Sequence, residues 1–103
     1  MDNERSIERY FVTQVRAAGG WPVKLSCPGT AGMPDRMVLW PDGRCHFIEL
    51  KAKGKRPRPL QVDRMERLNR FGFWTSWFSS RGEIDLYVAY YREVYDKKRG
   101  GAK

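Results

Sequence analysis

The chain has 103 residues, enough for one domain with a single sheet and a few helices but too few for a second core. A content of 41% hydrophobic and 14% aromatic residues excludes a largely disordered chain, and no apolar run approaches the roughly 20 residues of a membrane-spanning helix. The formal net charge of +8 suggests an anionic partner, with nucleic acid the first candidate, although a solvated basic surface would give the same charge. The two cysteines are too few for a disulfide framework, and without a signal peptide we expect free thiols in a reducing cytoplasm.

The first part of the chain predicts a helix, a strand and a loop. Apolar residues recur at helical spacing from Asn3 to Ala18, and glycine at position 19 ends the pattern. Residues Trp21 to Ser26 are typical of a strand, and a loop rich in glycine and proline then leads to Pro34.

A β-hairpin is predicted next, from strands at 35–40 and 44–51 around the turn sequence Pro41-Asp42-Gly43. This sequence suits a three-residue loop, a type I turn followed by a left-handed glycine. Counting back from such a loop places Asp35 directly across from Glu49, whereas a two-residue turn would send Asp35 to the opposite sheet face.

The second half predicts a helix from Pro59 to Gly72, a strand from Phe73 to Phe78 and a last helix from Gly82 to Tyr95. The aromatic strand is expected to be buried on both faces, in the interior or at a contact surface. Residues 1–95 should form a single domain, and the polar tail at 96–103 should fray. The order of elements predicts an α/β fold with a mixed sheet flanked by helices, its last strand parallel to the strand before the crossover.

The hairpin brings together residues that can carry metal chemistry. Side chains alternate along a strand, so Glu49 and Lys51 share one face, with Asp35 opposite Glu49. Two carboxylates that close repel unless a cation or a proton intervenes, and hard oxygen ligands favour Mg²⁺ or Mn²⁺. The carbonyl of Leu50 offers a further oxygen, and Lys51 can orient a water or stabilise developing charge. The alternative is an ordinary exposed pair of charged residues on a strand.

Basic residues follow this strand closely. The segment from Lys51 to Arg70 holds eight basic and two acidic residues, a net charge of +6. Such a segment would hold phosphates with salt-sensitive and largely sequence-independent affinity. A second wall of a DNA path is expected around the glycine loop, although its glycines alternatively serve only the turn. The candidate DNA-binding residues are Lys53, Lys55, Arg56 and Arg58 in the basic loop and Lys24 and Arg36 beside the glycine loop.

The aromatic surplus of the second half predicts a homodimer, because a domain of this size cannot easily bury so many rings. The residues concerned are the run Phe73 to Phe78 and Tyr87, Tyr90, Tyr91 and Tyr95. A zinc site made of Cys27, Cys45 and His46 is not expected, because adjacent Cys45 and His46 point to opposite sheet faces and a fourth ligand is missing.

Several strings of the sequence together resemble a known family over roughly residues 4 to 90. They are Gly32-Met33-Pro34-Asp35-Arg36-Met37-Val38-Leu39, Pro41-Asp42-Gly43, Phe47-Ile48-Glu49-Leu50-Lys51-Ala52 and Pro59-Leu60-Gln61. This combination resembles the VRR-NUC (virus-type replication and repair nuclease) branch of the PD-(D/E)XK superfamily, especially its short stand-alone phage and bacterial members.

The resemblance implies a restriction-endonuclease-like α-β-β-β-α-β core and Mg²⁺- or Mn²⁺-dependent cleavage of DNA. It makes Asp35 and Glu49 metal ligands and Lys51 the catalytic lysine, and it adds Gln61 and Glu8 to the site. Glu8 is a better match than Glu4 to the glutamate that the family carries on its first helix. The resemblance further suggests resolution of Holliday junctions by a homodimer, whose two-fold symmetry matches a junction. A phage-encoded protein of this kind would act in the cytoplasm of its bacterial host.

Alternatives remain at three points. Glu8 lies beside an apolar helix stripe, where it either tucks beneath the sheet or faces water. Gln61 either points inward to a polar partner or caps the first turn of its helix. The protein as a whole is alternatively a nucleic-acid-binding module that does not cut, or a protein-interaction subunit.

Overall fold

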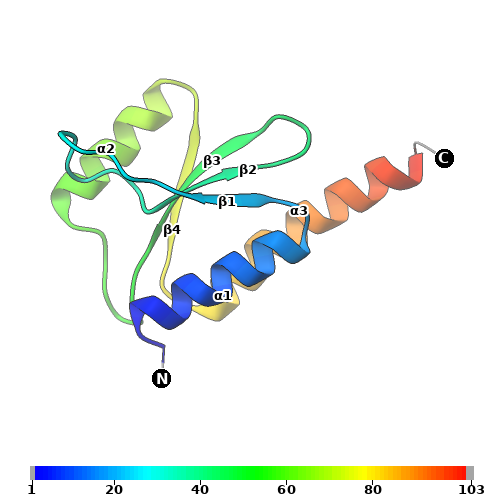
Figure 1. The fold of residues 1–103 in the computed structure, drawn as a ribbon, viewed down its shortest axis with the longest axis horizontal. Helices are drawn as coiled ribbons and strands as arrows, with labels where there is room; N and C mark the ends of the chain where they lie inside the picture. The colour runs from blue at the N-terminus through cyan, green and yellow to red at the C-terminus, as the bar shows by residue number, and fades with distance from the viewer. Residues whose placement is uncertain (1, 102–103) are drawn as a thin grey trace.

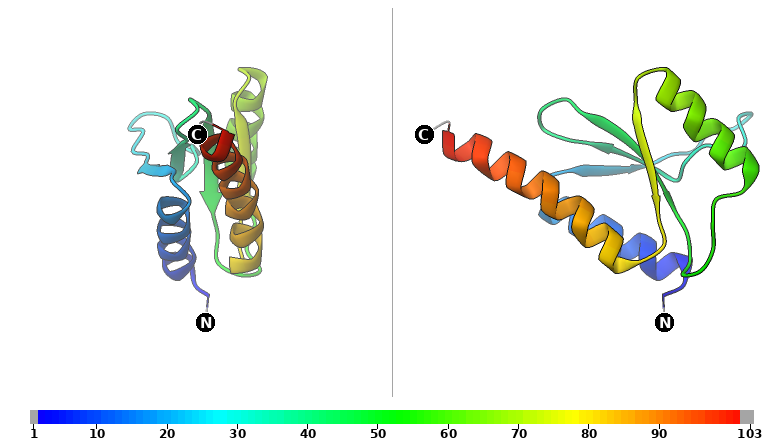
Figure 2. Two further views of the ribbon diagram at one scale, coloured as in Figure 1. Left: turned by 90° about the vertical axis from the view of Figure 1, so that its right-hand side faces the viewer. Right: turned by 180° about the vertical axis from the view of Figure 1, so that it is seen from behind.

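The computed structural model describes residues 2–101, and side chains as far as residue 94 (Figures 1 and 2). Seven elements follow one another along the chain, in the order that the sequence predicts. They are α1 (Glu4–Ala17), β1 (Trp21–Lys24), β2 (Arg36–Leu39), β3 (Cys45–Leu50), α2 (Pro59–Arg70), β4 (Trp74–Phe78) and α3 (Arg81–Gly101).

The four strands form one mixed sheet in the order β1-β2-β3-β4. The first three strands are antiparallel to their neighbours, and β4 pairs in parallel with β3, as the α2 crossover predicts. Helices α1 and α3 lie side by side against one face of the sheet, and α2 lies on the other side, next to the loop that precedes β2 (Figures 1 and 2). The predicted mixed α/β fold is confirmed.

The hairpin has the register that the turn sequence predicts. Gly43 adopts a left-handed φ of 92°, and its N–H donates to the Trp40 carbonyl at 2.9 Å. The Trp40 N–H donates to the Arg44 carbonyl at 2.9 Å, which closes a three-residue loop. Pairing continues through Arg36 opposite Ile48, so Asp35, one residue before β2, stands across from Glu49.

The α1 helix begins where its capping chemistry allows. The Asn3 side chain accepts a hydrogen bond from the Ser6 N–H at 2.8 Å, which satisfies a donor that has no partner within the helix. Ile7, Phe11 and Val15 form a fully buried stripe that packs against the sheet and α3.

One hydrophobic core lies between the sheet and the pair α1 and α3. Its largest fully buried apolar side chains are Phe11, Ile7, Ile48, Leu50, Ile84, Val15 and Val38. Ile48 and Leu50 belong to one face of β3, so Phe47, Glu49 and Lys51 are directed to the opposite face, which α2 covers. That second face holds the candidate site.

The aromatic strand is not buried on both faces within the domain, as one form of the prediction had it, and its burial at a contact surface stays a prediction. Phe78 is buried, but Phe73 and Trp74 are 40% and 44% exposed. The reason is that β4 is an edge strand, and α2 and α3 cover only part of it.

The last helix is longer than its sequence pattern predicts. It continues past the expected boundary at residue 95 to Gly101. Fraying of the tail stays a prediction, and residues 102 and 103 lie outside the described part of the chain. None of the helices in the described residues is long and apolar enough to cross a membrane.

Candidate active site

Asp35 is held in place by backbone contacts on two sides. Its carbonyl accepts from the Leu25 N–H at 3.0 Å, which anchors it to the end of β1. Its side-chain Oδ2 accepts from the Leu50 N–H at 3.0 Å, at the end of β3. The carboxylate is therefore fixed beside the β3 segment that carries Glu49 and Lys51.

Glu49 is a buried carboxylate whose two oxygens differ. The side chain is only 2% exposed. Oε2 accepts from the Lys51 Nζ at 3.1 Å and from the Gln61 Nε2 at 2.8 Å. Oε1 is also buried, yet no described residue donates a hydrogen bond to it. A buried acceptor without a donor is costly, and in a native protein it indicates a ligand or a water.

The environment of Glu49 opposes its negative charge. Burial raises the pKa of Glu49 above its ordinary value and the nearby charge of Asp35 raises it further, while the contact with Lys51 acts in the opposite direction. A cation bound between the two carboxylates would remove this penalty.

Gln61 satisfies both of the roles proposed for it. Its Oε1 accepts from the Arg58 N–H at 2.8 Å, which caps the first turn of α2. Its Nε2 donates to Glu49 across the interface between α2 and the sheet. The helix start thus orients the amide, and the amide orients the carboxylate.

The donor set fits a hard divalent cation such as Mg²⁺ or Mn²⁺. No cluster of three His, Cys, Asp or Glu side chains suited to a metal occurs within the described residues, so the pair Asp35 and Glu49 is not completed by a third such side chain. Mg²⁺ is typically bound by one or two carboxylates and keeps several waters, which this pair allows. The unpartnered Glu49 Oε1 supplies an oxygen that a cation could bind.

Glu8 lies among cations. Its Oε2 accepts from Lys24 and from Arg36, with N–O distances of 3.0 Å to each cation. Partial burial would raise the pKa of Glu8, but these two hydrogen bonds and charges outweigh burial and hold it below the ordinary value. Of the two alternatives, Glu8 is tucked against the sheet edge, and its role in the site stays a prediction.

The same ion pairs bear on the two expected DNA contacts beside the glycine loop. The side chain of Arg36 is 15% exposed and also donates to the Pro22 carbonyl at 3.0 Å, so it serves the junction of α1 with the sheet. Lys24 remains largely exposed. Contact of either residue with DNA stays a prediction, and Lys24 is the better placed of the two.

Glu4 is a site neighbour to which sequence reasoning gave second place. It is exposed at the start of α1, and its charge acts on Glu49, raising the pKa of that buried carboxyl. A spacing of four residues puts Glu4 and Glu8 on the same face of the helix. The sequence could therefore have predicted that both glutamates lie toward the site, instead of only one of them. Glu4 therefore adds negative potential at Glu49.

The basic loop leaves the site directly. Lys53, Lys55, Arg56 and Arg58 are all exposed and make no ion pair with other described residues. The Lys53 N–H donates to the Asp2 carbonyl at 3.3 Å, which ties the loop to the start of α1. The loop that follows Lys51 thus presents four exposed cations that are not paired with any acidic group of the described residues.

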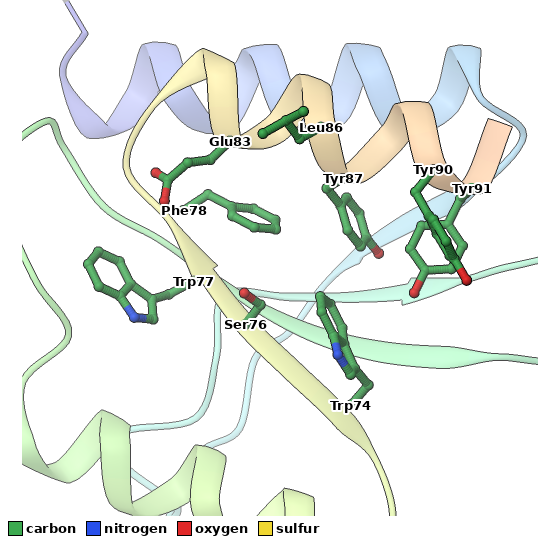
Figure 3. Close-up of a pocket in the computed structure, with 9 residues that line it drawn as sticks. All are labelled: Trp74, Ser76, Trp77, Phe78, Glu83, Leu86, Tyr87, Tyr90 and Tyr91. Carbon is green, nitrogen blue, oxygen red and sulfur yellow. The ribbon is translucent and has the colours of Figure 1, made fainter. Parts of the chain in front are cut away.

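A concave feature away from these residues, here called the aromatic groove, lies between β4 and α3 and has a volume of about 560 Å³ (Figure 3). Trp74, Tyr87 and Tyr91 gather at one end of it, with the rings of Trp74 and Tyr87 stacked at 5.6 Å. Leu86 and Tyr90 are exposed at its rim. None of the carboxylates of the candidate active site lines it, so its apolar character points to packing rather than to metal chemistry.

Comparison with known proteins gives two clear relatives. A protein of Acyrthosiphon pisum secondary endosymbiont phage 1, named "Putative nuclease p44", is 44% identical over 69 residues, which cover 67% of this chain and 74% of that protein. A solved structure described as a VRR_NUC domain superposes with a TM-score of 0.80 at 29% identity, covering 88% of this chain and 99% of the other. No family model matches this chain.

Proposed function

The chain belongs to the VRR-NUC family of nucleases, and we propose that it is a Mg²⁺- or Mn²⁺-dependent endonuclease that hydrolyses phosphodiester bonds in DNA. The observation that carries this proposal is the buried Glu49 Oε1, which lacks a hydrogen-bond donor beside Asp35 and Lys51. A purely structural glutamate would be expected to have both oxygens satisfied.

Asp35 and Glu49 would hold the cation, with the Leu50 carbonyl as a further oxygen ligand. When bound, the cation would lower the pKa of a water and neutralise charge on the phosphate under attack. Gln61 and Lys51 both bind Glu49 Oε2, so they fix the carboxylate with its other oxygen left for the cation. This arrangement preorganises the ligand before substrate arrives.

Lys51 would act on the reacting phosphate. Its ammonium group lies 3.1 Å from Glu49 Oε2, and its side chain is only 12% exposed. From there it can orient the attacking water or stabilise the negative charge that develops in the transition state. The exposed cations Lys53, Lys55, Arg56 and Arg58 would bind phosphates of the ground state instead.

We further propose that the preferred substrate is branched DNA such as a Holliday junction, cut by a homodimer in the bacterial cytoplasm. The aromatic groove supports the dimer, because exposed Trp74, Leu86 and Tyr90 make an apolar surface on a small domain. A two-fold dimer would present one site to each of two symmetry-related strands.

Metal binding and cleavage can be tested together. Calorimetric titration with Mn²⁺ should detect binding by the wild type and little or none by an Asp35→Ala, Glu49→Ala double variant. A matched control, Asp63→Ala with Glu66→Ala, removes two exposed carboxylates from α2 and should bind normally. Cleavage of a four-way junction, a flap, a duplex and a single strand should require Mg²⁺ or Mn²⁺.

The outcomes separate the proposal from its alternatives. Salt-sensitive DNA binding without cleavage would make the protein a binding module, and absence of both would favour an interaction subunit. Unchanged Mn²⁺ affinity in the Asp35, Glu49 double variant would remove the proposed cation site.

The dimer can be tested by sedimentation at micromolar concentration. The wild type should sediment as a dimer, whereas Leu86→Asp should give a monomer because it puts a charge in the aromatic groove. Val62→Asp on the exposed side of α2 is the matched control and should leave the dimer intact. A monomeric wild type, with and without DNA, would contradict the dimer and weaken the junction-resolving model.

A further inference from the structure

A separate groove, here called the α2 groove, lies between α2 and the loop that precedes β2, and has a volume of about 490 Å³. It is distinct from the aromatic groove and shares no lining residue with it. Its walls include Thr30 and Met33 from the loop and Arg64, Arg67, Leu68 and Phe71 from the helix.

Two contacts hold the loop against the helix. The Arg64 Nε donates to the Ala31 carbonyl at 3.0 Å. Gly32 packs so closely on the first turn of α2 that a Cβ there would come within 2.7 Å of the Leu60 side chain. At Gly29, by contrast, a Cβ would meet nothing within 4 Å, so the space widens away from the first turn.

Both walls of the α2 groove begin at the candidate active site. The loop runs directly into Asp35, and the first turn of α2 carries Gln61, which binds Glu49. From Gln61 to Phe71 the helical rise of 1.5 Å per residue gives about 15 Å. A DNA strand with a rise of 3.4 Å per nucleotide would cover that distance in about four nucleotides.

The far end of the α2 groove pairs an aromatic ring with a free cation. Phe71 is 70% exposed although it is one of the largest apolar side chains on this surface. Arg67 lies one helical turn before it, is exposed and makes no ion pair with the described residues, whereas Arg64 is paired with Asp63 at 2.8 Å. An exposed ring beside a cation is the combination that binds a base by stacking and its phosphate by charge.

We propose that the α2 groove binds an unpaired nucleotide of the DNA substrate, about four nucleotides from the bond that is cut. The base stacks on Phe71 and the phosphate contacts Arg67. A paired base inside a duplex cannot do this, because both of its faces are covered by its neighbours. This inference rests on the proposed nuclease function and adds that, among branched DNAs, those with an unpaired segment next to the cleavage position bind more tightly.

The test compares two DNA probes in EDTA, which prevents metal-dependent cleavage. One is a blunt duplex, and the other is the same duplex with a short unpaired extension at its 3′ or 5′ end that carries a fluorescent base analogue. The wild type should bind an extended duplex about tenfold more tightly than the blunt one, as one stacked base allows. The analogue should lose fluorescence when its base stacks.

Substitutions in the α2 groove should remove this preference selectively. Phe71→Ala should bind both probes like the blunt duplex, and Phe71→Trp should restore the preference. Trp21→Ala removes an equally exposed ring from β1 and is the control. Arg67→Ala should lower the slope of log affinity against log salt for the extended probe by about 0.7, and Arg16→Ala, on α1, should not.

A wild type that binds both probes equally, or a Phe71→Ala variant that keeps the preference, would overturn the inference. In those cases metal-dependent cleavage of duplex or junction DNA would leave the proposed function standing. Failure to bind or cut any DNA with Mn²⁺ would overturn the proposed function, and this inference with it. If Phe71→Ala weakens binding of both probes by the same factor, its effect does not depend on an unpaired base. That result would also count against nucleotide binding in the α2 groove.

Discussion

The two faces of β3 each bury one polar side chain, and the two side chains differ in whether all their polar atoms have hydrogen-bond partners. His46, 4% exposed, is on the face that α3 covers, and both of its ring nitrogens have partners. Its Nδ1 accepts from the indole Nε1–H of Trp40 at 3.1 Å and lies 2.7 Å from the Tyr87 hydroxyl, while Nε2 lies 3.3 Å from the Tyr91 hydroxyl. Glu49, on the α2 face, has one oxygen with two donors and one with none.

We interpret this difference as one between a structural polar group, His46, and a proposed metal ligand, Glu49. The network around His46 is complete without any ligand, so it fixes the position of α3 on the sheet. The network around Glu49 is complete only if something binds Oε1, so the fold there is less stable than it would be with a neutral residue. Burial alone does not distinguish the two faces, whereas a count of satisfied atoms does.

The largest effect is expected from Glu49→Gln, which keeps the shape of the side chain and removes its charge. Cleavage should fall by about 10³-fold or more, because a charged ligand beside Asp35 is lost. The free energy of unfolding in EDTA should rise slightly, because burial and the charge of Asp35 disfavour the ionised carboxyl by more than its contact with Lys51 favours it. Single-turnover cleavage and urea denaturation measure the two quantities.

The control is Glu66→Gln, which changes an exposed glutamate of α2 in the same way. It should leave both measurements unchanged. A Glu49→Gln protein that cuts DNA at the wild-type rate would contradict the proposed role of Glu49 as a metal ligand.

On the other face, His46→Ala should lower the free energy of unfolding by about 3 kcal/mol. It opens a cavity and removes a partner from Trp40, Tyr87 and Tyr91. Mn²⁺ affinity should stay the same, because the two sides of the sheet share no hydrogen bond through this ring. Cys45→Ala, at the next position along β3, is the control and should cost less than about 1 kcal/mol. Tenfold weaker Mn²⁺ binding in His46→Ala would mean that the two faces are coupled.

The titration of His46 predicts a pH dependence of stability. Burial, with a smaller effect of the Arg44 charge, lowers the pKa of His46 from 6.5 to about 4, so the folded protein keeps a neutral ring. Between these values the unfolded chain binds the proton more readily, and stability therefore falls as the pH is lowered from about 6.5 to 4. The loss approaches about 3 kcal/mol at the acidic end, and the contribution is constant above the unfolded pKa.

Urea denaturation across this pH range can isolate the contribution of His46. A His46→Gln variant lacks the titrating ring, so its stability should depend less steeply on pH than that of the wild type. Carboxyl groups titrate in both proteins, and the difference between the two curves removes them. Identical pH dependence in the two proteins would contradict a neutral buried His46.

The sequence predicts the Glu49 face better than the His46 face, because the Glu49 face is built from local signals. The turn at 41–43 sets the hairpin register, and the register brings Asp35 opposite Glu49. Strand alternation places Lys51 beside Glu49, and the helix start at Pro59 directs Gln61 inward. Each of these steps spans only a few residues with known geometry.

The remaining features depend on packing between distant segments. His46 meets Tyr87 and Tyr91 only because α3 crosses the sheet at a particular place, which no periodicity specifies. The ion pairs of Glu8 with Lys24 and Arg36 likewise require the docked position of α1. The partial exposure of β4 follows from its edge position, which the aromatic pattern does not reveal.

The smallest effect is expected from removing one cation of the basic loop that follows β3, for example Lys55→Ala. Lys55 is exposed, and on the proposed DNA path it would contact a phosphate only by charge, so each such loss should lower the slope of log affinity against log salt by roughly 0.9 on duplex DNA. The cleavage rate at saturating DNA should not change, because the contact is the same in the ground state and the transition state.

Lys51→Ala removes the same charge from the neighbouring Glu49 face, yet it should lower the cleavage rate and not the salt dependence of binding. Lys51 is already paired with Glu49, so its loss should leave the salt slope nearly intact and lower the cleavage rate, since its proposed role is expressed in the transition state. Arg16→Ala, on the exposed side of α1, should change neither quantity. Fluorescence anisotropy across salt concentrations gives the slopes, and single-turnover cleavage gives the rates. If Lys55→Ala keeps the full slope, the DNA path does not follow the basic loop. If Lys51→Ala cuts at the wild-type rate, the catalytic role proposed for Lys51 is wrong.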